Sequence, residues 1–156
     1  MDRREKAKLR GEHFKEGILE EIMNLTNEVL PYSLDKVDRV NKDHEVKYGD
    51  KVSLSVYIDE KAGVCRHQAL LVGYLIERLV KDGRLNGKVS VDRNFVKGKG
   101  GHAWVRYITS WGKEIILDPA NKFIGYAEEI DPEDLWFYKR PRSERIVRAV
   151  KNWLKS

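Results

Sequence analysis

The sequence predicts an α+β fold: a buried helix packed on an antiparallel sheet of three or more strands, with further helices toward both ends of the chain. Three observations lead to this prediction. The most continuously apolar run, 69–80, contains no proline and only two charged residues, which is typical of a buried helix. Short segments rich in aromatic and β-branched residues follow it, separated by turn-forming residues. Segments 12–30 and 143–155 each carry apolar residues along one helical face.

Length and composition bound the class of protein. The chain has 156 residues, most simply a single domain spanning 1–156 with its core at about 52–120. Its only cysteine has no partner for an internal disulfide, which favours a reducing compartment. No apolar run approaches the roughly 20 residues that cross a bilayer, and the basic N-terminus lacks the apolar stretch of a secretory signal. We therefore expect a cytoplasmic protein that does not associate with membranes.

The charge pattern limits the kinds of partner. The formal net charge is +5, but the 25 acidic residues are interspersed among the 30 basic ones. The densest basic segments, 6–10, 97–99 and 139–142, match no nucleic-acid-binding module. We therefore expect a solvated, mildly basic surface, and nucleic-acid binding is the less favoured interpretation.

The N-terminal third contains one well-marked helix. Residues 1–11 are expected to be frayed or weakly helical. In segment 12–30, apolar residues recur every three or four positions and predict an amphipathic helix that Pro31 ends. The stripe expected to face the core consists of Phe14, Ile18, Ile22, Leu25 and Val29. Segment 31–51 is polar and is interpreted as loop with short helical turns, and its His44 as a surface residue. Segment 52–58 alternates partway between apolar and polar residues and predicts a strand.

Cys65 is expected in the first turn of the buried helix, just after Gly63. Free backbone N–H groups and the positive end of the helix dipole favour a thiolate at that position. A lone cysteine is nevertheless more often a small core residue, so the downstream residues decide its role. His67 lies about 200° around the helix from Cys65 and should point away from it. The helix should end at Gly83 in a left-handed conformation.

Two strands, 100–108 and 114–118, are predicted to form a hairpin around the turn residues 109–113. If the hairpin is symmetric about Ser110, His102 faces Asp118 directly across the ladder. Residues paired in this way have Cβ atoms about 4.5–5.5 Å apart, so an imidazole can reach a carboxylate. A slip of one residue would turn one of the two side chains to the other face.

Further elements complete the sheet and its surroundings. Segment 88–96 predicts another strand, and 97–101 a flexible tip without the spacing of a phosphate-binding loop. Segment 123–126 predicts a short strand, and the aromatic cluster 135–138 predicts core packing. The last helix, 143–155, has Ser143 as its N-cap candidate and is expected to pack at the domain edge.

Three motifs in order resemble the transglutaminase-like branch of the papain-type cysteine enzymes: Gly-Val-Cys-Arg-His at 63–67, Gly-Gly-His-Ala-Trp-Val at 100–105 and Leu-Asp-Pro at 117–119. The resemblance spans about 52–120. It implies that Cys65 is the nucleophile, His102 the general base and acid, and Asp118 the acid that orients the histidine. It implies no metal or cofactor. The family includes proteases, amidases, deamidases and cross-linking acyltransferases, as well as members that no longer catalyse.

The expected chemistry is attack of Cys65 on an amide of a protein or peptide, giving a thioester that water or a second amine resolves. The backbone N–H of Cys65 is one natural oxyanion donor. At the second oxyanion donor the sequence departs from the family. No tryptophan precedes Trp104, and Asp59 lies where papain-like enzymes have glutamine. The hydroxyl of Tyr57 is only a candidate for this donor. The small size slightly favours hydrolysis. The alternative is a non-catalytic protein-binding domain that retains the fold.

Overall fold

The computed structural model describes residues 13–96, 98, 100–132 and 136–139. Within them the chain forms four helices and a four-stranded antiparallel sheet in the order β1-β2-β3-β4, which confirms the α+β class. The helices are α2 (His13–Val29), α3 (Leu34–Asp43), α4 (Leu54–Asp59) and α5 (Cys65–Lys81). The strands are β1 (Gly87–Val96), β2 (Gly100–Thr109), β3 (Glu114–Asp118) and β4 (Phe123–Tyr126), followed by the 3-10 turns η1 (Ala127–Glu129) and η2 (Trp136–Tyr138).

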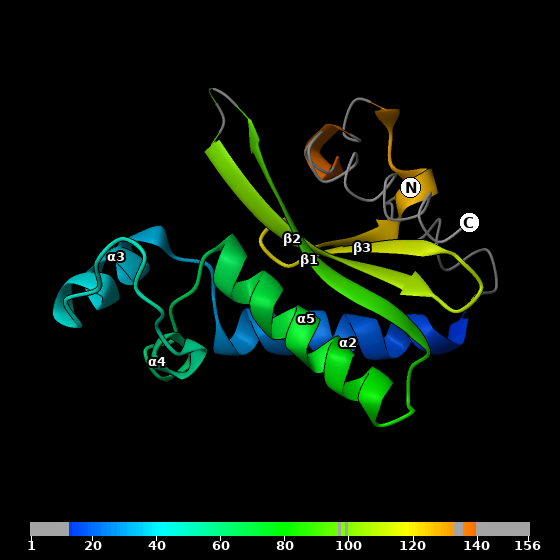
Figure 1. Ribbon diagram of the computed structural model, residues 1–156, viewed down its shortest axis with the longest axis horizontal. Helices are drawn as coiled ribbons and strands as arrows, with labels where there is room; N and C mark the ends of the chain where they lie inside the picture. The colour runs from blue at the N-terminus through cyan, green and yellow to red at the C-terminus, as the bar shows by residue number, and fades with distance from the viewer. Residues whose placement is uncertain (1–12, 97, 99, 133–135, 140–156) are drawn as a thin grey trace, which may run out of the picture.

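Helix α5 is the centre of the fold, as its apolar sequence predicts. It contacts β1, β2, β3 and α2, and α2 crosses the same face of the sheet beside it (Figure 1). The approach is close: a Cβ added to Gly73 would lie 2.8 Å from the side chain of Val91. The helix is not buried all round, because Leu70 and Tyr74 on its outer face are 51% and 57% exposed. The core between these layers consists of Leu19, Ile22, Met23, Ala69, Val72, Ile76, Leu85, Ala103, Val105, Tyr107, Ile115, Leu117 and Tyr126.

Both ends of α5 follow from local sequence. At the start, the backbone N–H of Val64 donates to Nδ1 of His67, one turn into the helix, at 3.1 Å. At the other end, Gly83 adopts a left-handed φ of +73°, as predicted, and the N–H of Arg84 returns to the carbonyl of Leu79. Cys65 is therefore fixed in the first helical turn.

Helix α2 lies where the sequence predicts it, but its buried face is rotated from the predicted stripe. Leu25 was expected to face the core and is 46% exposed, whereas Leu19 and Met23 are buried. The rotation follows from packing, since α2 contacts α5 as well as the sheet-side core.

Residues Leu54–Asp59 form the helix α4, so the strand predicted at 52–58 is wrong. Ser53 caps α4 by accepting a hydrogen bond from the N–H of Ser55 at 3.3 Å, and Tyr57 is buried against a cluster that includes Leu30 and Val64. Local capping and burial of one aromatic ring outweigh the β-branched composition of this short segment. The preceding segment is also more regular than expected: Ser33 caps the ten-residue α3, which buries only Val37 and Val40.

The other four predicted strands are all present, but the β2–β3 register differs from the predicted one. Val105 pairs with Leu117 and Ile108 with Glu114, so the hairpin is centred on Trp111 rather than Ser110. The reason is the turn, in which the N–H of Thr109 donates to the carbonyl of Lys113 at 2.9 Å and encloses the residues between them. Each β2 residue pairs with a β3 residue two positions from its predicted partner, and a shift of two residues leaves every side chain on its predicted face of the sheet.

The face of the sheet turned away from α5 is covered by the aromatic segment. Phe137 and Tyr138 pack with Trp104, Ile116 and Ile130, which confirms the predicted core packing for these two rings.

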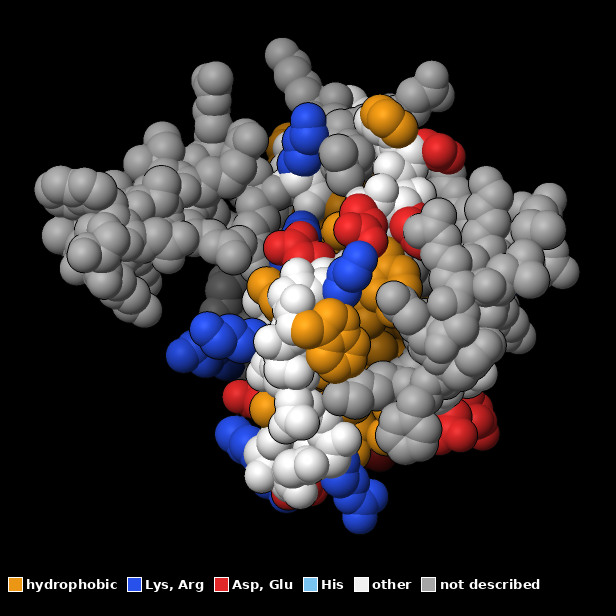
Figure 2. Space-filling model, turned by 90° about the vertical axis from the view of Figure 1, so that its right-hand side faces the viewer, with side chains coloured by type: hydrophobic (Ala, Val, Ile, Leu, Met, Phe, Trp, Pro, Cys, Tyr) orange, Lys and Arg blue, Asp and Glu red, His pale blue; other side chains and the backbone are white. Residues whose placement is uncertain are grey.

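The predicted terminal features at 1–11 and 143–155, with Ser143, lie outside the described residues. None of the described helices is long and apolar enough to cross a membrane. On the face shown in Figure 2, basic and acidic side chains are interspersed around a hydrophobic patch rather than separated by sign.

Gly87 provides a test of the sheet register. Its φ is +147°, and a Cβ there would overlap the carbonyl oxygen of Ile108. Gly87→Ala should therefore lower the free energy of unfolding by roughly 2–4 kcal/mol in urea denaturation. Gly17→Ala is the matched control, because nothing lies within 4 Å of its Cβ position and α2 should gain about 0.5–1 kcal/mol. Equal effects of the two substitutions would contradict the pairing of β1 with β2.

Candidate active site

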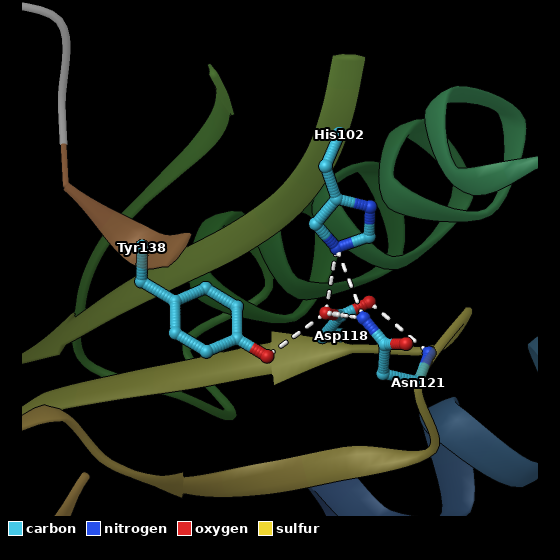
Figure 3. Close-up of polar contacts among 4 residues, drawn as sticks. All are labelled: His102, Asp118, Asn121 and Tyr138. Carbon is cyan, nitrogen blue, oxygen red and sulfur yellow. Dashed lines mark hydrogen bonds and ion pairs between the residues drawn. The ribbon is translucent and has the colours of Figure 1, made fainter. Parts of the chain in front are cut away.

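His102 and Asp118 meet on the sheet, although not directly opposite each other as predicted. Continuing the observed β2–β3 register places Asp118 opposite Trp104, so His102 is its diagonal neighbour on the same face. The two side chains span this diagonal, with Nε2 of His102 2.6 Å from Oδ2 of Asp118 (Figure 3). Asp118 is fully buried and the His102 side chain is 16% exposed. The predicted juxtaposition therefore holds despite the shifted register.

Asp118 also accepts hydrogen bonds from two residues that the sequence did not single out. The hydroxyl of Tyr138 donates to Oδ2 at 2.9 Å, and Nδ2 of Asn121 donates to the same oxygen at 2.7 Å (Figure 3). The backbone N–H of Asn121 donates to Oδ1 at 3.3 Å. A buried carboxylate needs such donors to offset its loss of hydration. The position of Asn121, three residues after Asp118 in a turn, was a detectable signal, whereas nothing in the sequence placed Tyr138 here.

Arg106 connects the turn that carries Tyr138 to the sheet. Its Nε donates to Oδ2 of Asp92 at 2.8 Å, and its Nη1 donates to Oε2 of Glu114 at 2.7 Å. Its Nη2 donates to the backbone carbonyl of Tyr138 at 2.8 Å. The guanidinium is nearly buried and uses three of its donors, so it holds η2 where the Tyr138 hydroxyl reaches Asp118.

Cys65 lies at the start of α5 against the imidazole of His102. Burial opposes ionisation of the thiol, but hydrogen bonds from His102 and from the backbone N–H of Ala103, the charge of His102, and the N–H of Arg66 outweigh it. The pKa of Cys65 is therefore lowered from its ordinary value. Because Nε2 of His102 is bonded to Asp118, Nδ1 is the ring nitrogen that remains for the sulfur.

The same contacts favour the charged form of His102. Burial lowers its pKa, but the hydrogen bonds to Asp118 and Cys65 and the negative charges of both raise it to about 9. At neutral pH the ring of His102 is therefore charged, and this charge favours the thiolate form of Cys65. This state is the one that a cysteine nucleophile needs.

The other candidates from the sequence have separate roles. His67 stacks on Tyr57 with ring centroids 4.0 Å apart, and its pKa is lowered to about 4 by burial and by the charge of Arg66. It therefore does not act as a second base at neutral pH. The hydroxyl of Tyr57 donates to Oδ1 of Asn41 at 2.7 Å, which leaves no free proton for an oxyanion. No cluster of His, Cys, Asp and Glu that could hold a metal is found in the part of the chain that the structure describes.

Comparisons of the chain with models of known protein families, with curated proteins and with solved structures find no match. The function therefore has to be inferred from the arrangement of Cys65, His102 and Asp118 and from the groups that hold them.

Asp118→Asn tests the electrostatics of the site. The pKa of His102 is raised above its ordinary 6.5, so the folded state favours the cation; this stabilisation is complete below pH 6.5 and is lost as the pH rises through about 9. Without the negative charge of Asp118, the pKa of His102 should fall by about 1–2 pH units in an NMR titration of the ring.

Glu128→Gln is the matched control, since it removes one negative charge from an exposed pair with Lys113. It should leave the titration of His102 unchanged. An equal pKa of His102 in Asp118→Asn and in the unsubstituted protein would contradict the assigned role of Asp118.

Proposed function

We propose that the protein is a transglutaminase-like cysteine enzyme that acts on amide bonds of proteins or peptides through a Cys65–His102–Asp118 triad. The observation that carries the proposal is the shared imidazole: one side of His102 is bonded to a buried carboxylate at 2.6 Å and the other faces the only thiol of the chain. In the same proposal the fold is a papain/transglutaminase-like domain. The free cysteine suits the reducing environment of the cytoplasm.

The first half of the reaction forms a thioester. The Cys65 thiolate attacks the carbonyl carbon of the amide, a C–S bond forms, and the carbonyl electrons move onto oxygen. The backbone N–H of Cys65, in the first turn of α5 and without an intrahelical acceptor, is one donor for this oxyanion. When the C–N bond breaks, the His102 imidazolium gives its proton to the leaving amine.

The second half releases the acyl group. Neutral His102 accepts a proton from water or from a second amine as that nucleophile attacks the thioester carbonyl, and the C–S bond then breaks to regenerate the thiolate. Hydrolysis and transfer differ only in this nucleophile. Throughout the cycle Asp118 holds the ring orientation and stabilises the imidazolium, while Tyr138 and Asn121 hold Asp118.

Acylation of the thiol tests the proposal. With a nitrophenyl ester, the protein should release a stoichiometric burst of nitrophenolate and carry the acyl group on the peptide that contains Cys65, as detected by mass spectrometry. Cys65→Ala should abolish the burst, and His102→Ala should slow it by about 10²–10⁴-fold because the thiolate and the general acid are lost together. His44→Ala, at an exposed histidine, should leave the rate unchanged.

A non-catalytic binding domain gives a different result. Its thiol would react no faster than a free cysteine at the same pH, and His102→Ala would have no effect. Either observation would overturn the proposal. Where the burst is present, a screen of labelled peptide amides against the unsubstituted protein and Cys65→Ala identifies the substrate.

A further inference from the structure

A cavity of about 520 Å³ opens beside α5, beginning at the residue that follows Cys65. Its inner wall is α5, and its outer wall is the segment that joins α3 to α4. Helices α3 and α4 lie beside the N-terminal end of α5 (Figure 1). Cys65 itself does not line the cavity, and the chemistry described above does not use it. The lining residues that carry the argument are Asn41, Lys47, Asp50, Lys51, Arg66 and His67.

Two polar side chains in the cavity wall have hydrogen-bond donors that no other described residue uses. Oδ1 of Asn41 already accepts from the Tyr57 hydroxyl at 2.7 Å, and Nδ1 of His67 already accepts from the N–H of Val64 at 3.1 Å. The amide nitrogen of Asn41 and Nε2 of His67 have no partner among the residues described. Since His67 is only 5% exposed, its unpaired N–H is held in place by the surrounding structure.

The protonation state of His67 strengthens this point. Its ring is neutral at physiological pH, because burial and the positive charge of Arg66 lower its pKa to about 4. With Nδ1 occupied as an acceptor, the single ring proton must be on Nε2. The cavity therefore keeps a fixed donor at this point and offers no acceptor there.

The rim of the cavity adds positive charge. Lys47, Lys51 and Arg66 line it and have no ion-pair partner among the described residues. The single carboxylate of the lining, Asp50, accepts the backbone N–H of Lys47 at 2.7 Å through Oδ2. Unpaired cations together with unused hydrogen-bond donors favour a ligand group that is negatively charged and accepts hydrogen bonds.

We propose that this cavity binds the carboxylate side chain of a peptide substrate, a glutamate or aspartate close to the amide that Cys65 attacks. The inference rests on the proposed function. Arg66 and His67 directly follow Cys65 in the first turn of α5, so the cavity and the sulfur lie at the same end of this helix. An extended peptide advances about 3.3 Å per residue, so the three positions on either side of the reacting bond reach about 10 Å from the sulfur. Apolar lining residues, Val46, Val52, Leu54 and Leu70, suit the methylene groups of that side chain.

The test uses matched peptide electrophiles that alkylate Cys65 and carry either glutamate or glutamine at one position. Peptide chloromethyl ketones cover the three positions on the acyl side, and N-chloroacetyl peptides cover the three on the amine side. The second-order rate of each is divided by the rate with iodoacetamide on the same variant, which cancels changes in thiol reactivity. At one position or more, glutamate should react about five- to tenfold faster than glutamine.

The variants assign this preference to the cavity. Arg66→Gln should reduce the preference for glutamate over glutamine to less than about twofold. Lys51→Gln should reduce this preference partly. Lys88→Gln removes the same charge from an exposed site on β1 and should leave it intact. Salt near 1 M, where the screening length is about 3 Å, should also suppress it.

Absence of any glutamate preference, or a preference equally strong in Arg66→Gln, overturns the inference. These outcomes are distinct from failure of the proposed function. An ordinary thiol still reacts with these probes, so the ratio is measurable in either case. Failure of the enzyme proposal is recognised separately, by an iodoacetamide rate that His102→Ala does not change.

Discussion

The hydrogen bond between His102 and Asp118 is the interaction on which the site depends. It joins β2 to the end of β3, fixes which ring nitrogen is left for Cys65, and raises the pKa of His102 to about 9. The lowered pKa of Cys65 depends in turn on that charged ring. Without the bond, the chain would retain a free thiol at a helix start, which alone does not make a nucleophile.

The surrounding structure holds this bond from two sides. On one face of the sheet, α5 packs closely enough at Gly73 that its first turn, with Cys65, is fixed relative to β2. On the other face, Arg106 holds the turn that delivers the Tyr138 hydroxyl to Asp118. The catalytic hypothesis therefore involves more of the fold than the three residues themselves. Burial of Arg106 and Asp118 is tolerated because each side chain makes several hydrogen bonds.

Much of this arrangement was accessible from the sequence, and the failures have physical causes. The long apolar run and the alternating segments of the sheet each depend on local periodicity, so α5 and the four strands were predicted. Segment 52–58 was misassigned because capping by Ser53 and burial of Tyr57 override its weak alternation. His102 and Asp118 are adjacent although the predicted hairpin centre was wrong. The register differs by two residues, so both side chains stay on the predicted face of the sheet. Tyr138 and Arg106 could not be foreseen, since their contacts join segments with no periodic relation.

The most direct test is the ionisation of Cys65, followed by the ultraviolet absorbance of its thiolate as a function of pH. The chain has one cysteine, so the signal belongs to that residue alone. The thiolate should form below the ordinary thiol range near pH 8.5, and His102→Ala should return the transition to that range. A transition of the unsubstituted protein at the ordinary pH, unmoved by His102→Ala, would contradict a preassembled thiolate–imidazolium pair.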